Sequence, residues 1–248
     1  MTGKTALVTG GGSGLGKQFA QTLADAGATV ILAARRLKPL EETASAIRTS
    51  GGTAYCAVLD VADTGGFDAA FNTIAKIGAI DVLVNNAGIA AHHSLFDVTE
   101  ETWDRVMNVN LKGAWLTSRA TARLMIARNT PGSIINISSV LDSAVQKGTA
   151  NYPASKAALT HLTRSMAVEW AKFGIRVNAI APGYFQTELS TEFVESDQGK
   201  AMLKRMPQRR LGNPGELSGA LLLLASDAST YMTGSVVTVD GGLSLALV

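Results

Sequence analysis

Short apolar runs of strand length alternate along this chain with longer segments in which apolar residues recur at helical spacing. The runs are almost continuous in Val, Ile, Leu and Ala, as expected of strands buried on both faces, and lie at 5–9, 29–33, 54–59, 82–85, 133–137, 176–181 and 236–239. The helical patterns lie between them, at 15–26, 40–50, 66–77, 99–127, 150–172 and 214–225. Strands that alternate with helices of this length are typical of βαβ units, so the pattern predicts an α/β fold with a parallel sheet.

One segment departs from this alternation. Residues 188–210 are polar and charged, show only weak periodicity, and lie between a strand and a helix. Long excursions of this kind often form lids over active sites. We therefore expect one domain over residues 1–248, with a substrate lid around 188–210.

Composition and charge fit a single domain of 248 residues and exclude several classes of partner. The formal net charge is only +2 and the charges are scattered, which argues against a nucleic-acid interface or a polybasic membrane anchor. The longest aliphatic run, 221–225, is far too short to span a bilayer, and the N-terminus lacks signal-peptide architecture. We expect a cytoplasmic protein in which Cys56, the only cysteine, is a buried apolar thiol.

The chemistry is concentrated around the segment Tyr-Pro-Ala-Ser-Lys at 152–156. On a helix, a phenol at Tyr152 and an ammonium at Lys156 share one face, because they are four residues apart. This pair alone is a weak signal. Four further features precede it in order, namely a glycine cluster at 9–16, an Asn-Asn-Ala-Gly segment at 85–88, Asn110 and, thirteen residues before the tyrosine, Ser139. The combination is very improbable by chance.

These features together resemble the short-chain dehydrogenase/reductase superfamily in its compact form of about 250 residues. The resemblance extends from Lys4 to the closing Val-Asp-Gly-Gly at 239–242. It implies a Rossmann fold, with a doubly wound, seven-stranded parallel sheet and helices on both faces. It also implies an NAD(P)-dependent carbonyl reductase or alcohol dehydrogenase that forms a homotetramer. Helices 99–127 and 150–172 would then form one interface, and the tail 243–248 another.

The glycine cluster follows a strand and opens a helix, which is the context that a phosphate-binding loop requires. Glycines let the backbone approach a pyrophosphate, and the helix N-terminus offers N–H groups and a positive dipole end. The spacing Thr-Gly-x3-Gly-x-Gly is the form that the resembled superfamily uses. A tight turn without a ligand is the alternative, and the crowding of glycines disfavours it. We expect the cofactor to contact Gly10, Gly12, Ser13, Gly14, Leu15 and Gly16.

The end of the second strand bears on the choice between NAD and NADP. In dinucleotide folds an acid at this place binds the ribose hydroxyls of NAD, whereas an arginine accommodates the 2′-phosphate of NADP. Here Ala34 replaces the acid, and Arg35 and Arg36 follow. Two arginines in a turn can also be merely solvated. The missing acid favours NADP(H) and leaves NAD(H) possible.

The resemblance implies the remaining cofactor contacts. Asp60 and Val61, after the third strand, would contact the adenine, and Asn86, Ala87 and Gly88 would lie under the adenine ribose. The nicotinamide carboxamide would be held by the loop that contains Pro182, Gly183, the Phe185 backbone and the Thr187 hydroxyl. Tyr152 and Lys156 would complete the set, with Lys156 bonded to the nicotinamide ribose.

Four residues would carry the reaction. Hydride transfer to a carbonyl carbon leaves negative charge on oxygen, so a proton donor is needed, and we expect Tyr152 to serve as general acid and base. An unperturbed tyrosine has a pKa near 10, and an ammonium such as that of Lys156 can lower a neighbouring pKa by about 1–3 units. Ser139 would donate a hydrogen bond to the substrate oxygen. Asn110 would hold a water in a proton relay, or kink its helix, or both.

The substrate stays open among three classes, with Ser139, Leu141, Tyr152 and Tyr184 as the residues expected to contact it. Reductases of carrier-bound 3-oxoacyl groups are similar throughout, but they have an arginine where this chain has Phe173. Segment 181–188 and the apolar tail resemble gluconate 5-dehydrogenases. The apolar segment 140–145 suits a less polar ketone. A non-catalytic cofactor-binding protein is the remaining alternative, although such relatives usually lose a catalytic residue. No metal site is expected, because His92 and His93 have no third ligand at zinc-like spacing.

Overall fold

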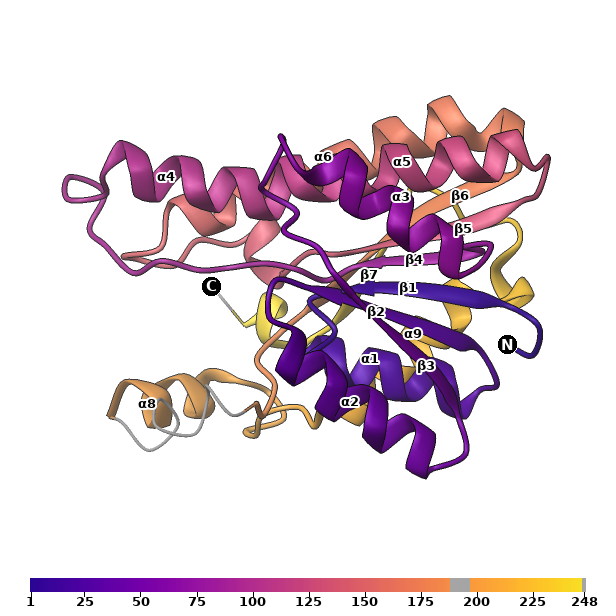
Figure 1. The fold of residues 1–248 in the computed structure, drawn as a ribbon. Helices are drawn as coiled ribbons and strands as arrows, with labels where there is room; N and C mark the ends of the chain where they lie inside the picture. Colours follow the sequence, from indigo (N-terminus) through magenta and orange to yellow (C-terminus); the bar gives the residue numbers. More distant parts are fainter. Residues whose placement is uncertain (188–196, 247–248) are drawn as a thin grey trace.

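The computed structural model describes residues 1–187 and 197–246, which form a three-layer α/β structure around one sheet (Figure 1). The sheet has the strand order β3-β2-β1-β4-β5-β6-β7, and each neighbouring pair is parallel. Its strands are β1 (Thr5–Thr9), β2 (Thr29–Ala34), β3 (Thr53–Val58), β4 (Val82–Asn85), β5 (Gly132–Ile137), β6 (Ile175–Pro182) and β7 (Val236–Val239). The order reverses direction between β1 and β4, which confirms the doubly wound Rossmann fold.

Helices cover both faces of this sheet. One face carries α1 (Gly14–Asp25), α2 (Leu37–Thr49) and α9 (Ser218–Ala225), and the other carries α3 (Phe67–Ile77), α4 (Glu100–Met107), α5 (Gly113–Ala127) and α6 (Asn151–Trp170) (Figure 1). Successive strand residues point to opposite faces. Ala6 and Val8 therefore pack in the core under α1 and α9, whereas Leu7 packs in the core under α3, α5 and α6. Two apolar cores thus fix the sheet between its helices.

The helix predicted at 99–127 is interrupted in the structure. It begins at α4, where the Thr99 hydroxyl caps the helix by accepting a bond from the Thr102 N–H at 3.2 Å. A π-helical turn, Asn108–Lys112, then separates α4 from α5 and contains the fully buried Asn110. Such turns are frequently found at functional sites. Asn110 therefore lies in a π-helical turn between two α-helices, and the expected kink stays a prediction.

Cys56 is only partly buried, contrary to the expectation of a buried thiol. It lies on β3, which is the edge strand of the sheet and exposes Tyr55 on one face and Val58 on the other. The apolar character of a strand does not reveal its place in the sheet, so this exposure was not evident from the sequence. Burial still raises the pKa of the Cys56 thiol.

The predicted lid overlaps the part of the chain that the structure leaves undescribed. Residues 188–196 lie outside the described residues, and 197–205 form α8 (Asp197–Arg205), which extends from the body of the domain (Figure 1). Met206 and Leu211, just beyond α8, are buried in a small apolar cluster with Val140 and Leu243. This cluster connects the segment after α8 to the end of β5 and to the C-terminal tail. Within the described chain, no helix combines the length and apolar character needed to cross a bilayer.

Candidate active site

The loops at the carboxyl ends of the strands enclose a cleft of about 560 Å³. Because parallel strands end at the same edge, residues from distant parts of the chain lie together here. The cleft is beside β1 and β4, the neighbouring strands from which the strand order runs in opposite directions. The lining includes the following residues from the predicted site: Gly10, Ser13, Gly14, Leu15, Arg36, Asn86, Ala87, Gly88, Ser139, Tyr152, Lys156, Pro182, Gly183 and Thr187. The structure therefore brings most of the predicted cofactor and catalytic residues into one place.

The glycine loop has the geometry of an anion cradle. Gly10 has a φ of +68°, which L side chains rarely adopt, and a Cβ at Gly16 would collide with the Gly10 carbonyl oxygen. Gly16 does not line the cleft and instead lets α1 pack closely under the loop. Ser13 is the N-cap residue of α1, but its side chain makes no capping bond. The first-turn N–H groups and the Ser13 hydroxyl are therefore available to a phosphate.

A second cavity of about 410 Å³ continues from the loop towards the ends of β2 and β3. Among the residues that line it are Gly12, Ala34, Arg35, Arg36, Asp60, Val61 and Arg105. No acid takes the place of Ala34, and Arg36 lines both cavities. Arg105, on α4, was not predicted. Its spacing of four residues from Val109, which lines the same cavity, places both on one helical face.

Lys156 lies buried on α6 beside Tyr152. Its Nζ donates a hydrogen bond to the Ile137 carbonyl at 2.7 Å and lies 5.7 Å from the centre of the Tyr152 ring. Gly88 leaves room at this point, since a Cβ there would be 3.5 Å from Nζ and 3.4 Å from Asn110 Oδ1. Burial lowers the pKa of Lys156 to about 8. The ammonium form therefore predominates at neutral pH, and its charge is lost in mildly alkaline solution.

The pKa of Tyr152 is raised, which is opposite to the expected direction. Burial of the phenol is the main cause, the Ser139 hydrogen bond lowers the pKa in part, and the neighbouring Tyr184 raises it further. Desolvation penalises the phenolate and decides the direction, and Lys156 is not among the causes of the shift. Tyr152 consequently keeps its proton at neutral pH, as a proton donor to a carbonyl must.

The Ser139 hydroxyl is oriented by the backbone. Its Oγ accepts a hydrogen bond from the Leu141 N–H at 3.1 Å, which leaves its own proton to be donated to the Tyr152 oxygen or to a substrate oxygen. Ser138 is bonded differently, because its Oγ is 2.7 Å from the Thr160 Oγ1 on α6. This difference supports the choice of Ser139 over Ser138 as the donor to a substrate oxygen.

The Asn110 side chain joins three parts of the site. Its Oδ1 accepts from the Ile89 N–H at 2.8 Å, and its Nδ2 donates to the Ile89 carbonyl at 2.9 Å and to Ser155 Oγ at 3.0 Å. Ser155 Oγ donates in turn to the Tyr152 carbonyl at 2.7 Å. The side chain thus connects the π-helical turn to the first turn of α6. Its role in a proton relay stays a prediction.

The two other predicted substrate residues, Leu141 and Tyr184, line a neighbouring cavity of about 400 Å³. The walls are mostly apolar, with Val140, Val145, Met202 and Leu243, and include the cations Lys147 and Arg205. Tyr184 Oη donates to Gln146 Oε1 at 3.0 Å. Sequence reasoning missed Lys147 and Arg205, because only the fold brings the turn after β5 and α8 to one cavity.

The Phe185 side chain is directed away from the cleft, and Phe185 is not among the residues that line it. Its ring is buried, packs in the apolar core and lies against Gly212, where a Cβ would collide with it. The neighbouring Thr187 lines the cleft. The expected backbone contact of Phe185 with the cofactor stays a prediction.

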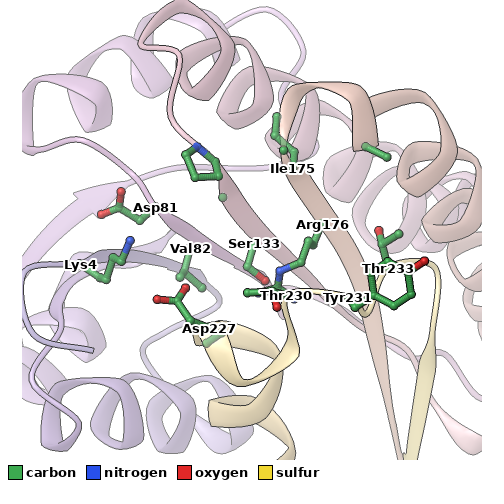
Figure 2. A pocket seen from close by; sticks show the side chains of 15 residues that line it. Lys4, Asp81, Val82, Ser133, Ile175, Arg176, Asp227, Thr230, Tyr231 and Thr233 are labelled. Atoms are coloured by element: carbon green, nitrogen blue, oxygen red, sulfur yellow. The ribbon is translucent and has the colours of Figure 1, made fainter.

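A larger cavity, of about 600 Å³, lies at the opposite edge of the sheet. Figure 2 shows Lys4, Asp81, Arg176, Asp227 and Tyr231 around it, at the amino ends of β4, β5 and β6. The Arg176 guanidinium is already bonded to the Ser229 hydroxyl and to the carbonyls of Leu224, Ser226 and Met232. None of the four predicted catalytic residues lines this cavity, so size does not identify the reaction site. Across residues 1–187 and 197–246, His, Cys, Asp and Glu side chains form no group of three that could hold a metal ion.

Comparisons with known proteins agree with this geometry. The family model described as enoyl-(acyl carrier protein) reductase matches residues 10–244. Gluconate 5-dehydrogenase of Gluconobacter oxydans is 38% identical over 100% of this chain and 97% of its own length. A 3-oxoacyl-(acyl-carrier-protein) reductase of Thermotoga maritima is 40% identical over 98% of each chain. The crystal structure of a gluconate 5-dehydrogenase from Burkholderia cenocepacia, in complex with NADP and tartrate, superposes with a TM-score of 0.94 at 41% identity and covers 99% of this chain and 96% of that one.

Proposed function

The chain belongs to the short-chain dehydrogenase/reductase family. From this premise we propose that it is an NADP(H)-dependent enzyme that reversibly reduces the ketone group of a keto acid to the alcohol of a hydroxy acid. The observation that carries the proposal is the cleft at the carboxyl edge of the sheet, where Ser139, Tyr152 and Lys156 lie next to the glycine loop. A cofactor site and a proton donor are thereby adjacent. Both are required for reduction of a carbonyl group.

The site fits a dinucleotide. The left-handed Gly10, the uncapped side chain of Ser13 and the open first turn of α1 form a cradle for its pyrophosphate. Arg35 and Arg36 would bind the 2′-phosphate of NADP, because Ala34 offers no acceptor to ribose hydroxyls. The similar gluconate 5-dehydrogenase from Burkholderia cenocepacia, crystallised with NADP, supports this choice.

The nicotinamide, when bound, supplies the hydride that reduces the substrate carbonyl carbon. Ser139 donates a hydrogen bond to the substrate oxygen, and Tyr152 delivers its phenolic proton to the same oxygen. The Lys156 ammonium stabilises the phenolate that this transfer leaves behind. Asn110 holds the backbone at Ile89 and the first turn of α6 in place around them.

A hydroxy-acid substrate is supported by the charge of the adjoining cavity. Lys147 and Arg205 can receive a carboxylate, and the Tyr184–Gln146 pair can receive hydroxyl groups. Several similar proteins are named for such substrates, including a 5-keto-D-gluconate 5-reductase of Escherichia coli that is 39% identical. The apolar wall around Val140 and Met202 favours a second candidate, a 3-oxoacyl substrate. Phe173 argues against docking of a carrier protein, because such reductases have an arginine at this place.

A substrate panel with NADPH tests the proposal. We expect the highest kcat/KM for a keto sugar acid such as 5-ketogluconate, a lower value for the matching neutral ketose, and the lowest for a 3-oxoacyl thioester. A preference for the thioester would favour the second candidate. Absence of NADPH oxidation with every ketone and aldehyde in the panel would overturn the proposed function.

We also propose a cytoplasmic homotetramer. Trp115, Ile126, Val168 and Phe173 expose apolar surface on or beside α5 and α6, and Val168 is 81% exposed. Apolar surface of this kind is typical of subunit interfaces. Chemistry that uses NADPH and a chain with one cysteine both suit a reducing compartment.

A further inference from the structure

A short turn connects the end of β5 to the reacting groups. Ser139 begins this 3₁₀ turn, Val140–Asp142, and its carbonyl accepts a hydrogen bond from the Asp142 N–H at 2.9 Å. The Leu141 N–H bonds to Ser139 Oγ at 3.1 Å. The positions of Ser139 and Asp142 are therefore coupled, and whatever holds Asp142 also orients the Ser139 hydroxyl.

Asp142 is held by α6. Its Oδ2 accepts a hydrogen bond from Thr160 Oγ1 at 2.6 Å, and Ser138 Oγ lies 3.3 Å from the same oxygen. The Ser138 and Thr160 hydroxyls are 2.7 Å apart. A hydroxyl has one proton, so Thr160 gives its proton to the carboxylate and Ser138 donates to Thr160. Bonds to an ionised acceptor are shorter and stronger than neutral ones, which makes this contact a firm link between turn and helix.

Thr160 lies on the face of α6 that carries the chemistry. It follows Lys156 by four residues and Tyr152 by eight, so the three side chains are aligned along the helix. Fixing Thr160 to the turn therefore sets the position of the phenol and the ammonium relative to Ser139. The hydroxyls of Ser139 and Tyr152 must both reach one substrate oxygen, so their relative position affects the rate of carbonyl reduction.

We propose that Asp142 is a positioning residue that locks the Ser139 turn to α6 and so aligns the Ser139 and Tyr152 hydroxyls. The role of this alignment in carbonyl reduction rests on the proposed function. Asp142 itself need not touch the substrate. Its carboxylate acts through Thr160 and Ser138, which are both buried.

The first test compares Asp142→Ala with Asp142→Asn, with saturating NADPH and the best ketone of the panel. We expect Asp142→Ala to lower kcat about tenfold or more, since small misplacements of reacting groups have effects of this size. The KM for NADPH should stay unchanged. The asparagine variant keeps an acceptor oxygen and should retain most of the activity. Wild-type kcat in Asp142→Ala, or equal loss in both variants, would overturn the proposal.

Thr160→Val provides the matched partner variant. If the bond is the cause, the double variant Asp142→Ala/Thr160→Val should lose no more activity than either single variant. Losses that multiply would show independent roles. A merely structural role predicts that kcat follows the melting temperature across the series, whereas positioning predicts a loss of kcat in variants with unchanged unfolding.

A titration without substrate separates this proposal from the proposed function. The tyrosinate absorbance of wild type minus that of Tyr152→Phe reports Tyr152 alone. Because the Ser139 bond lowers the pKa of Tyr152, loosening the turn in Asp142→Ala should move that titration to higher pH. An unmoved titration would overturn the positioning role even if the enzyme proves inactive on every ketone.

Discussion

Two ionisable side chains, Tyr152 and Lys156, determine how the site responds to pH. Burial raises the pKa of Tyr152, so the phenol is protonated at neutral pH and ready for reduction of a carbonyl. The reverse reaction needs the phenolate, so alcohol oxidation should increase with pH. Burial also lowers the pKa of Lys156 to about 8, so the ammonium charge is present at pH 7. Holding that charge in the interior has a cost in stability.

Lys156→Met should therefore stabilise the protein without cofactor at pH 7 while it impairs turnover. The pKa of the lysine falls from its ordinary value of 10.5 to about 8, which corresponds to at most about 3 kcal/mol. Loss of the bond to the Ile137 carbonyl offsets part of this, which leaves about 1–2 kcal/mol. Thermal unfolding with and without NADPH measures the effect.

The stability difference between Lys156→Met and the wild type should depend on pH. Between about pH 8 and 10.5 the native lysine is neutral while the unfolded one is still charged, so the wild type gains stability as the pH rises. The advantage of Lys156→Met should accordingly shrink towards pH 10. Lys147→Met, at an exposed lysine, should leave the melting temperature unchanged at both pH values. A lower melting temperature for Lys156→Met at pH 7 would contradict the account.

We expect the choice between NADPH and NADH to depend on the residues after β2. Arg35 lines the cavity beside Ala34, and one or two bonds from arginine to a phosphate favour NADPH by about 10–100-fold. Ala34→Asp combined with Arg35→Ala should reverse this preference, because it adds an acceptor for ribose hydroxyls and repels the phosphate. The measurement is the ratio of kcat/KM for NADPH over NADH at two salt concentrations.

Lys38→Ala serves as the control for this exchange. Lys38 is exposed in the first turn of α2, but it is not among the residues that line the cofactor cavities. Its removal should leave the ratio unchanged, and salt should weaken the wild-type preference. A wild type that prefers NADH, or a double variant with an unchanged ratio, would show that Arg35 is a solvated turn residue.

The helices were predicted less closely from the sequence than the strands. The pattern at 99–127 predicted one helix, because apolar residues keep helical spacing through the π-helical turn that holds Asn110. Helix α8 was missed for another reason, since its residues are mostly polar or charged and lie in a segment with only weak apolar periodicity. The strands were predicted closely, because burial on both faces dictates their composition.

Helix α6 carries chemistry on one face and exposed apolar surface on another. Val168→Glu should dissociate the proposed tetramer, because it places a charge on a side chain that is 81% exposed and would be buried between subunits. Light scattering after size-exclusion chromatography gives the particle mass. Ser45→Glu, on the exposed side of α2 and the opposite face of the sheet, should leave the particle intact. A wild type that elutes as a monomer would exclude the tetramer.

The residues of the candidate active site follow four different strands of the sheet. The glycine loop follows β1, the Asn-Ala-Gly segment follows β4, Ser139 follows β5, and the loop with Gly183 and Thr187 follows β6. These positions could be predicted, because each lies next to a recognisable strand. Two features could not be predicted, namely the raised pKa of Tyr152 and the presence of Lys147 and Arg205 in one cavity. Burial and proximity arise only when the layers pack. The hydrogen bonds around Asp142 could not be predicted from the sequence either, because they join residues 138, 142 and 160 through tertiary contacts.

The most direct test compares the wild type with Tyr152→Phe in two parallel measurements, NADPH binding by fluorescence and ketone reduction by NADPH oxidation. Tyr152 lines the cleft and is the proposed proton donor, so its loss should leave the Kd for NADPH nearly unchanged and lower kcat by about 10²–10⁴-fold. Near-normal kcat in Tyr152→Phe would contradict the assignment of the proton donor. A wild type that binds NADPH but reduces no carbonyl compound would contradict the proposed reaction itself.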